Sequence, residues 1–94
     1  MSYYDRDGLD VEDQRMIIII HAVWGVTPNL KIGKKYTLKQ MVDIVHPGWW
    51  ENNLKPYDAR SAGVTFINLV NEGWFPELAA NIKHNSSNQF IRIK

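Results

Sequence analysis

Four polar side chains that can bond to base edges lie on the face of a predicted helix opposite its apolar stripe: Arg60, Ser61, Thr65 and Asn68. An arginine can donate two hydrogen bonds to O6 and N7 of guanine, and an asparagine can pair with N6 and N7 of adenine. The hydroxyl groups of serine and threonine can bond to either kind of base. If the helix that carries these residues enters a major groove, this face predicts contact with double-stranded DNA. A solvated polar face, which every amphipathic helix has, is the alternative.

Basic residues elsewhere could neutralise phosphates around such a helix. Residues 1–13 hold five acidic residues and one basic residue, a balance of −4, whereas residues 14–94 hold ten basic residues and five acidic ones, a balance of +5. An acidic leader on a mildly basic body is compatible with nucleic-acid binding and with an ordinary solvated surface. The lysines expected to contact phosphates are Lys34, Lys35, Lys39, Lys55 and, at the tip of a hairpin, Lys83.

Three tryptophans support an alternative function. Trp49, Trp50 and Trp74 flank the helix described above, and tryptophan is enriched in the residues that dominate protein interfaces. Adjacent tryptophans must point in different directions, so one of Trp49 and Trp50 is a candidate for exposure. A place in the core is the simpler interpretation for these side chains. This alternative is a protein-interaction module, such as a phage-encoded inhibitor that docks on a host protein complex.

Catalytic and metal sites are not expected. The chain has no cysteine, which excludes disulfides, zinc fingers and thiol catalysis. His21, His46 and His84 fall in three different predicted elements, without the close spacing of a zinc site. No nucleophile, base and orienting group form a recognisable motif. We therefore expect no enzyme activity, no bound metal and no cofactor.

The first element that must position these residues is predicted at residues 11–24. Asp10 is a plausible N-cap, and Gly25 followed by Pro28 is a plausible end of a helix. Four consecutive isoleucines, at residues 17–20, favour a strand instead, because β-branched residues lose rotamer freedom in helices. The length of the segment favours the helix, but the strand stays open.

Two further helices are predicted. Thr37 and Gln40 form a capping-box pattern, and apolar residues at helical spacing follow until Pro47. Residues 49–57 are rich in turn formers. A longer helix is expected to begin at Asp58 and to end at Gly73, a position that suits a left-handed C-cap. Its apolar stripe is predicted to comprise Ala59, Ala62, Gly63, Phe66, Val70 and Gly73.

Short strands complete the pattern. Residues 35–37 are expected to form a very short strand, and residues 78–84 and 89–93 a hairpin around the loop 85–88. Residues 1–9 are predicted to be a loose acidic leader before a single domain at residues 10–94. The longest apolar run, residues 16–20, is too short to span a membrane. We expect a cytoplasmic protein, as a monomer or a homodimer.

The end of the third predicted helix resembles a signature of winged-helix regulators. Phe66, Leu69, Val70, Gly73 and Trp74 match a pattern of hydrophobic, Leu, hydrophobic, Gly and hydrophobic residues. In that family the glycine closes the recognition helix and the next residues enter the wing. The resemblance implies an α+β, winged-helix-like domain, with three helices followed by a C-terminal β-hairpin wing. About twelve residues separate Val45 from Asp58, compared with three or four in a tight helix-turn-helix.

The chain is also similar to a small bacterial and phage family of unknown function. That resemblance supports the winged-helix-like fold and brings no activity with it. A small DNA-binding regulator encoded by a phage or mobile element is the function we expect. The matching positions are Trp50, Leu54, Arg60, Gly63, Phe66, Val70, Gly73 and Asn88.

Overall fold

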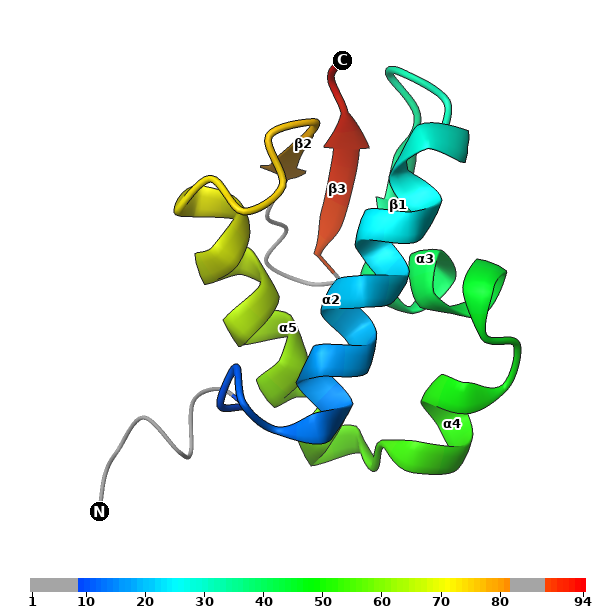
Figure 1. Ribbon diagram of the computed structural model, residues 1–94, viewed down its shortest axis with the longest axis vertical. Coiled ribbons are helices and arrows are strands. Elements are labelled where there is room, and N and C mark those ends of the chain that lie inside the picture. The colour runs from blue at the N-terminus through cyan, green and yellow to red at the C-terminus, as the bar shows by residue number, and fades with distance from the viewer. Residues whose placement is uncertain (1–8, 82–87) are drawn as a thin grey trace.

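The computed structural model describes residues 9–81 and 88–94, and in them the chain is an α+β protein (Figure 1). Within these ranges the structure has four α-helices, one short 3₁₀ turn and a three-stranded sheet. In chain order they are α2 (Gln14–Val26), η1 (Thr27–Asn29), β1 (Lys35–Thr37), α3 (Leu38–Val45), α4 (Trp49–Asn53), α5 (Pro56–Asn71), β2 (Leu78–Asn81) and β3 (Gln89–Arg92).

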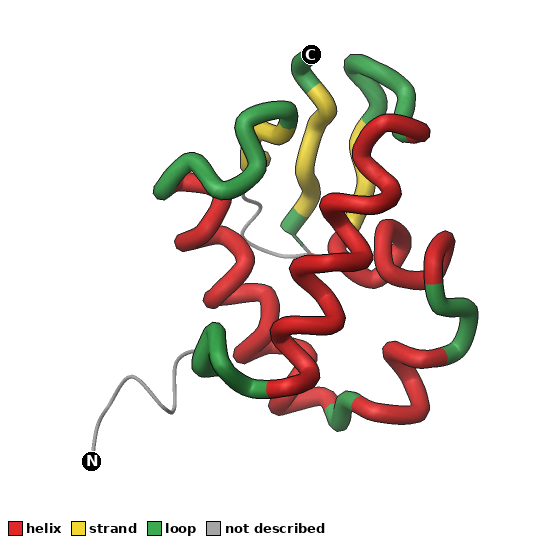
Figure 2. Tube along the Cα trace, in the orientation of Figure 1, coloured by secondary structure: helices red, strands yellow, loops and turns green. Residues whose placement is uncertain are grey.

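The three strands lie side by side in the half of the molecule where the C-terminus lies, and α2 extends into the same half (Figure 2). The sheet is antiparallel, with β3 between β1 and β2. Phe90 of β3 lies opposite Tyr36 on one side and Ala80 on the other. Phe90 and Tyr36 are buried and join side chains of α2, α3 and α5 in one core. The two strands of the predicted hairpin are paired antiparallel over Leu78–Asn81 and Gln89–Arg92. Residues 82–87, which were predicted to hold the end of the first strand and most of the loop, lie outside the described residues.

The first predicted element is a helix, and the strand alternative is wrong. Ile19 and Ile20 are both buried whereas Ile17 is 39% exposed, a pattern that fits a period of 3.6 residues and not the alternation of a strand. The cap was misplaced by three residues. The carboxylate of Asp13, not that of Asp10, accepts a hydrogen bond from the backbone N–H of Arg15 at 2.8 Å, because Asp10 instead closes a turn that precedes the helix.

The capping box of α3 is confirmed. The hydroxyl oxygen of Thr37 accepts the backbone N–H of Gln40 at 3.1 Å, and the side-chain oxygen of Gln40 accepts the backbone N–H of Thr37 at 2.8 Å. Each bond satisfies a donor that the first turn of a helix leaves without a partner. This local geometry fixes where β1 ends and α3 begins.

Two predictions for the middle of the chain are wrong. Residues 49–53 form the short helix α4 instead of a turn, and α5 begins at Pro56, two residues before the expected cap at Asp58. Proline suits the first position of a helix because its φ is already helical and it lacks an N–H that would need a partner. The carboxylate of Asp58 accepts the backbone N–H of Lys55 at 3.3 Å and pairs with Arg15 at 3.2 Å. Asp58 thus ties the start of α5 to the start of α2.

The end of α5 agrees with the sequence prediction. Gly73 has a φ of 93°, which a residue with a Cβ rarely adopts. Its N–H bonds to the carbonyl of Val70 at 3.1 Å, and the N–H of Trp74 bonds to the carbonyl of Leu69 at 3.0 Å. This pair of bonds is a Schellman motif, which satisfies the last carbonyls of the helix and turns the chain toward β2.

Leu9, which was assigned to the loose leader, contacts the rest of the domain. The backbone N–H of Leu9 bonds to the carbonyl of Ser61 at 3.2 Å, and its carbonyl accepts the hydroxyl of Thr65 at 2.5 Å. Its side chain packs against the core. The other residues of the expected acidic leader, 1–8, lie outside the described ranges. Among the helices that the structure describes, none combines the length and apolar character of a membrane span.

Candidate functional site

One row of exposed side chains runs along α5. The row lies at spacings of three and four residues, so it follows one face of the helix. It contains one cation and no acidic residue. Among the described residues, the guanidinium of Arg60 has no hydrogen-bond or ion-pair partner. We call this row the α5 stripe, and it comprises Tyr57, Arg60, Val64, Asn68 and Asn71.

Two of the predicted base-contacting residues do not belong to the α5 stripe. Ser61 is only 3% exposed and Thr65 only 8% exposed, so the prediction that they lie on an exposed face is wrong. The hydroxyl of Thr65 donates to the carbonyl of Leu9, and the carbonyl of Ser61 accepts the N–H of the same residue. Leu9 therefore covers this side of α5. Arg60 and Asn68 are exposed, as predicted.

A groove of about 470 Å³ lies beside the α5 stripe. Its apolar lining includes the buried residues Leu38 of α3, Trp50 of α4 and Phe90 of β3. Arg60 and Val64 line it from α5, and Asn88 lines it from the end of the β2–β3 connection. The stripe and the hairpin thus meet at one concave surface, which we call the α5 groove.

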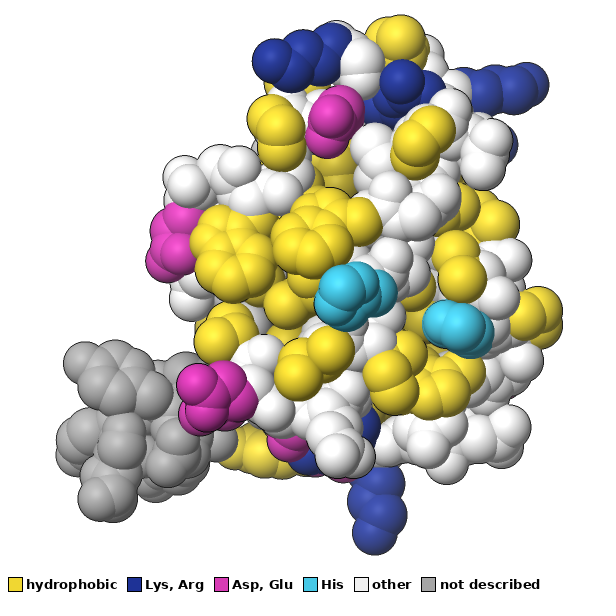
Figure 3. All heavy atoms as spheres, in the orientation of Figure 1, with side chains coloured by type: hydrophobic (Ala, Val, Ile, Leu, Met, Phe, Trp, Pro, Cys, Tyr) yellow, Lys and Arg dark blue, Asp and Glu magenta, His cyan; other side chains and the backbone are white. Residues whose placement is uncertain are grey.

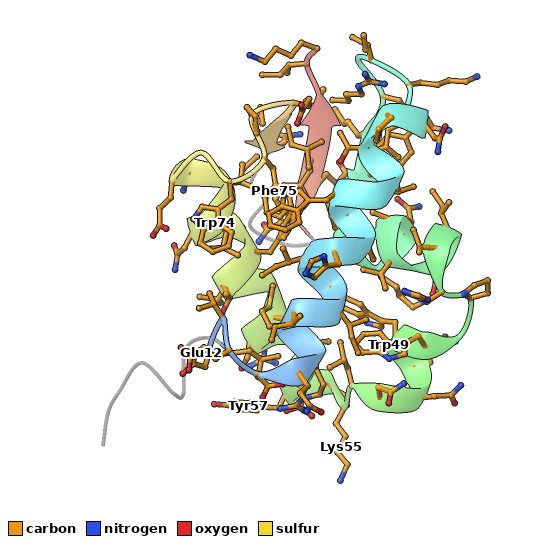
Figure 4. The ribbon with its side chains drawn as sticks, in the orientation of Figure 1. Glu12, Trp49, Lys55, Tyr57, Trp74 and Phe75 are labelled. Atoms are coloured by element: carbon orange, nitrogen blue, oxygen red, sulfur yellow. The ribbon has the colours of Figure 1, made fainter. Side chains whose placement is uncertain are left out.

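The predicted lysines are not gathered at this groove. Lys39 lines it, but its ammonium group pairs with Asp43 at 3.3 Å and with Glu51 at 3.5 Å. The hydrogen bond with Asp43 raises the pKa of Lys39, so the group stays charged while its charge is compensated locally. Lys55 lies just before α5, and Figure 4 shows its side chain projecting away from the protein. Lys83 lies outside the described residues.

Lys34 and Lys35 belong to a separate basic surface. The backbone N–H of Gly33 bonds to the carbonyl of Arg92 at 2.7 Å, which joins the loop before β1 to the end of β3. Lys34 lies over the ring of Tyr36, 5.5 Å from its centroid. Figure 3 shows Lys and Arg side chains at the end of the molecule where the C-terminus lies. The sequence analysis did not anticipate this basic end, which comprises Lys31, Lys34, Lys35, Arg92 and Lys94.

The three predicted interface tryptophans differ in exposure. Trp50 is 9% exposed and belongs to the core, and Trp49 is partly buried and packs against it. The expectation that one of them is exposed is therefore wrong, because α4 turns both toward the core. Trp74 is 39% exposed, as the interface hypothesis requires. It stacks on Trp24, which is 45% exposed, with ring centroids 6.4 Å apart and an interplanar angle of 12°.

Trp24 is a candidate residue that the sequence analysis missed. Its indole N–H donates to the carbonyl of Trp74 at 3.1 Å, which holds the two rings together. His21 contacts Trp24 edge-on at 5.3 Å, and Ile17 lies one turn earlier on the same side of α2. Figure 3 shows hydrophobic side chains and a histidine on this surface, and Figure 4 labels Trp74 and Phe75 there. We call Ile17, His21, Trp24 and Trp74 the aromatic face.

Comparison of the chain with protein-family models, with curated proteins and with solved structures found no match. In the part of the chain that the structure describes, no three His, Asp or Glu side chains lie close enough together to hold a metal ion. The described residues thus present three candidate binding surfaces: the α5 stripe, the α5 groove and the aromatic face.

Proposed function

We propose that this chain is a winged-helix-like domain that binds double-stranded DNA through α5. The observation that carries the proposal is the α5 stripe, in which Arg60 and Asn68 are exposed on one face with no acidic residue between them. The guanidinium of Arg60 has no partner among the described residues, so DNA would not have to break an ion pair to bind it. Arginine and asparagine are the side chains best suited to guanine and adenine edges.

The order of the elements supports this proposal. A helix, a short strand, two helices, a longer helix and a hairpin follow one another, and Gly73 ends the longer helix in a left-handed conformation. In a winged-helix domain this longer helix is the recognition helix and the hairpin is the wing. The short helix α4 accounts for the long connection between α3 and α5.

The α5 groove supports a shared surface for helix and hairpin. Arg60 and Val64 line it together with Asn88, which immediately precedes β3. A duplex whose major groove receives α5 would then meet the hairpin at the adjacent backbone. Contacts between the hairpin and the DNA backbone would position the protein on the duplex, whereas contacts between α5 and the base edges would select the sequence.

The phosphate contacts are few. Lys55, at the start of α5, is the best placed lysine, whereas the charge of Lys39 is already compensated by Asp43 and Glu51. A formal net charge of +1 gives the whole chain little long-range attraction to DNA. We therefore propose weak nonspecific binding and a larger share of the affinity from base contacts.

A salt titration tests the proposed function. The protein is expected to bind random duplex DNA at ~50 mM salt, and the logarithm of its affinity should fall linearly with the logarithm of salt concentration. Lys55→Ala should make that slope less steep by about one, the change expected for losing one phosphate contact. The side chain of Lys55 points into solvent at the start of α5, where it could reach a phosphate. His21→Ala, on the aromatic face, is the matched control and should leave the slope unchanged. Absence of salt-dependent binding by the wild-type protein would rule the proposal out.

A protein partner is a second candidate function, favoured by the exposed stack of Trp24 and Trp74. Glu12 and Glu72 are exposed, and neither carboxylate has a partner among the described residues. Both adjoin elements that supply the aromatic face, so we propose a partner with a basic, partly apolar surface. A phage-encoded inhibitor that docks on a host protein complex would be a protein of this kind.

A pull-down from a host lysate distinguishes the two candidates. A specific partner should be retained by the wild-type protein and by Arg60→Ala, and lost with Trp74→Ser, which removes one ring of the stack. Thermal unfolding checks that both variants are folded. Equal retention by Trp74→Ser would exclude the aromatic face as the binding surface.

A further inference from the structure

We propose that Val64 recognises the 5-methyl group of thymine, between a guanine read by Arg60 and an adenine read by Asn68. This inference rests on the proposed binding of DNA through α5. On this basis the α5 stripe prefers a DNA sequence with a thymine between a guanine and an adenine.

The spacing of the three residues suits a single major groove. Arg60, Val64 and Asn68 are four residues apart in turn, so each lies about 6 Å further along the helix axis. Base pairs are stacked at about 3.4 Å. A helix lying along the groove would therefore place these side chains at roughly every second base pair. The three contacts span about 12 Å, or four to five base pairs.

Val64 is exposed where a base edge could reach it. Its side chain is 36% exposed although it borders the α5 groove. The neighbouring Gly63 has no side chain, and a Cβ built there would meet no atom within 4 Å apart from its chain neighbours and the backbone of α5. In the major groove the thymine methyl is the apolar group that an apolar side chain can contact. A cytosine at the same position would instead present an amino group, and the side chain of Val64 has no atom that can accept a hydrogen bond from it.

The flanking residues make this assignment specific. The guanidinium of Arg60 has no partner in the described structure, and Asn68 is exposed two turns further along. Single exposed apolar residues are common on protein surfaces. Val64 differs from the others because it lies between two side chains that suit base edges, Arg60 and Asn68. The acidic residue nearest to it in the chain, Asp58, is already paired with Arg15.

The experiment begins with selection from a random duplex pool by the wild-type protein. We expect an enriched site with a G·C pair and an A·T pair on either side of a central T·A pair. The thymine at this centre is then replaced by uracil, which removes only the methyl group. Affinity of the wild-type protein should fall about 4-fold, the factor expected for losing contact with one methyl-sized group.

Val64→Ala is the variant that links this methyl group to the protein. It should bind the thymine site about as weakly as the wild-type protein binds the uracil site, and it should no longer distinguish the two. Val45→Ala, an exposed valine on α3, is the matched control and should behave as the wild-type protein does. Thermal unfolding confirms that both variants are folded.

The outcomes separate this inference from the proposed function. If the wild-type protein binds no DNA, the proposed function fails and this inference with it. If it binds DNA but selects no thymine, or if Val64→Ala still distinguishes thymine from uracil, the role of Val64 is overturned while DNA binding stands.

Discussion

Replacing Phe66 with alanine is expected to cost about 3–5 kcal/mol of folding free energy, the largest single effect that we predict for this chain. Phe66 is fully buried. Its ring lies 4.8 Å from that of Phe75 and 4.8 Å from that of Phe90, the latter in an edge-to-face arrangement. Alanine would therefore leave a cavity where α5, the turn after it and β3 meet.

Urea denaturation measures this effect. A domain of 94 residues has a total stability of roughly 5–14 kcal/mol, so Phe66→Ala should unfold at a much lower urea concentration and could unfold without denaturant. Phe66→Leu fills much of the same volume and keeps the protein folded for comparison. Val64→Ala, two residues away on the exposed side, should change stability by no more than about 0.5 kcal/mol. A loss below about 1 kcal/mol for Phe66→Ala would contradict the central place of this ring.

Features that depend on neighbouring residues could be predicted from the sequence. The capping box at Thr37 needs only Gln40 three positions later, and Gly73 ends α5 because a left-handed residue there favours glycine. A helix at residues 11–24 was predicted from the length of the segment even though its four isoleucines favour a strand, and the observed helix spans Gln14–Val26. Burial of Met16, Ile19 and Val23 on one side of that helix outweighs the modest propensity penalty.

Features that depend on tertiary packing could not be predicted. Asn52, Asn53 and Pro56 indicate a turn, yet residues 49–53 are helical because burial of Trp50 and Leu54 in the core favours that conformation. The misplaced start of α5 has the same origin. The local sequence gives the helix or turn propensity of such a segment, but it does not show which surface of the protein the segment packs against.

Only part of the candidate site could be predicted, because tertiary packing also decides which side chains of α5 are exposed. Helical periodicity placed Ser61 and Thr65 beside Arg60, and it could not show that Leu9 binds to that side of α5. Likewise, the stack of Trp24 on Trp74 joins residues fifty positions apart. The spacing of Ile17, His21 and Trp24 on one side of a helix was a signal for that face, and the apolar run of isoleucines concealed it.

Arg60→Ala is expected to weaken binding to a selected DNA site by about 1–3 kcal/mol, or roughly 5- to 150-fold. The residue is exposed near the start of α5, and its guanidinium has no partner among the described residues. Its removal should therefore leave the melting temperature close to that of the wild-type protein. Binding to random duplex DNA should fall much less, because only the loss of one positive charge contributes there.

Arg60→Lys distinguishes base recognition by Arg60 from simple attraction to phosphate. Lysine keeps the positive charge but lacks the planar fork that donates two parallel hydrogen bonds to guanine. If Arg60 reads a base, the lysine variant should bind random DNA as the wild-type protein does and should lose most of its preference for the selected site. If Arg60 only neutralises a phosphate, Arg60→Lys should resemble the wild-type protein on both DNAs, and Arg60→Ala should weaken both to the same degree. Fluorescence anisotropy titrations of the three proteins against the two DNAs, at one fixed salt concentration, separate these results. Equal losses on both DNAs would remove Arg60 from the residues that select sequence, and the preference would then have to come from Asn68 or Val64.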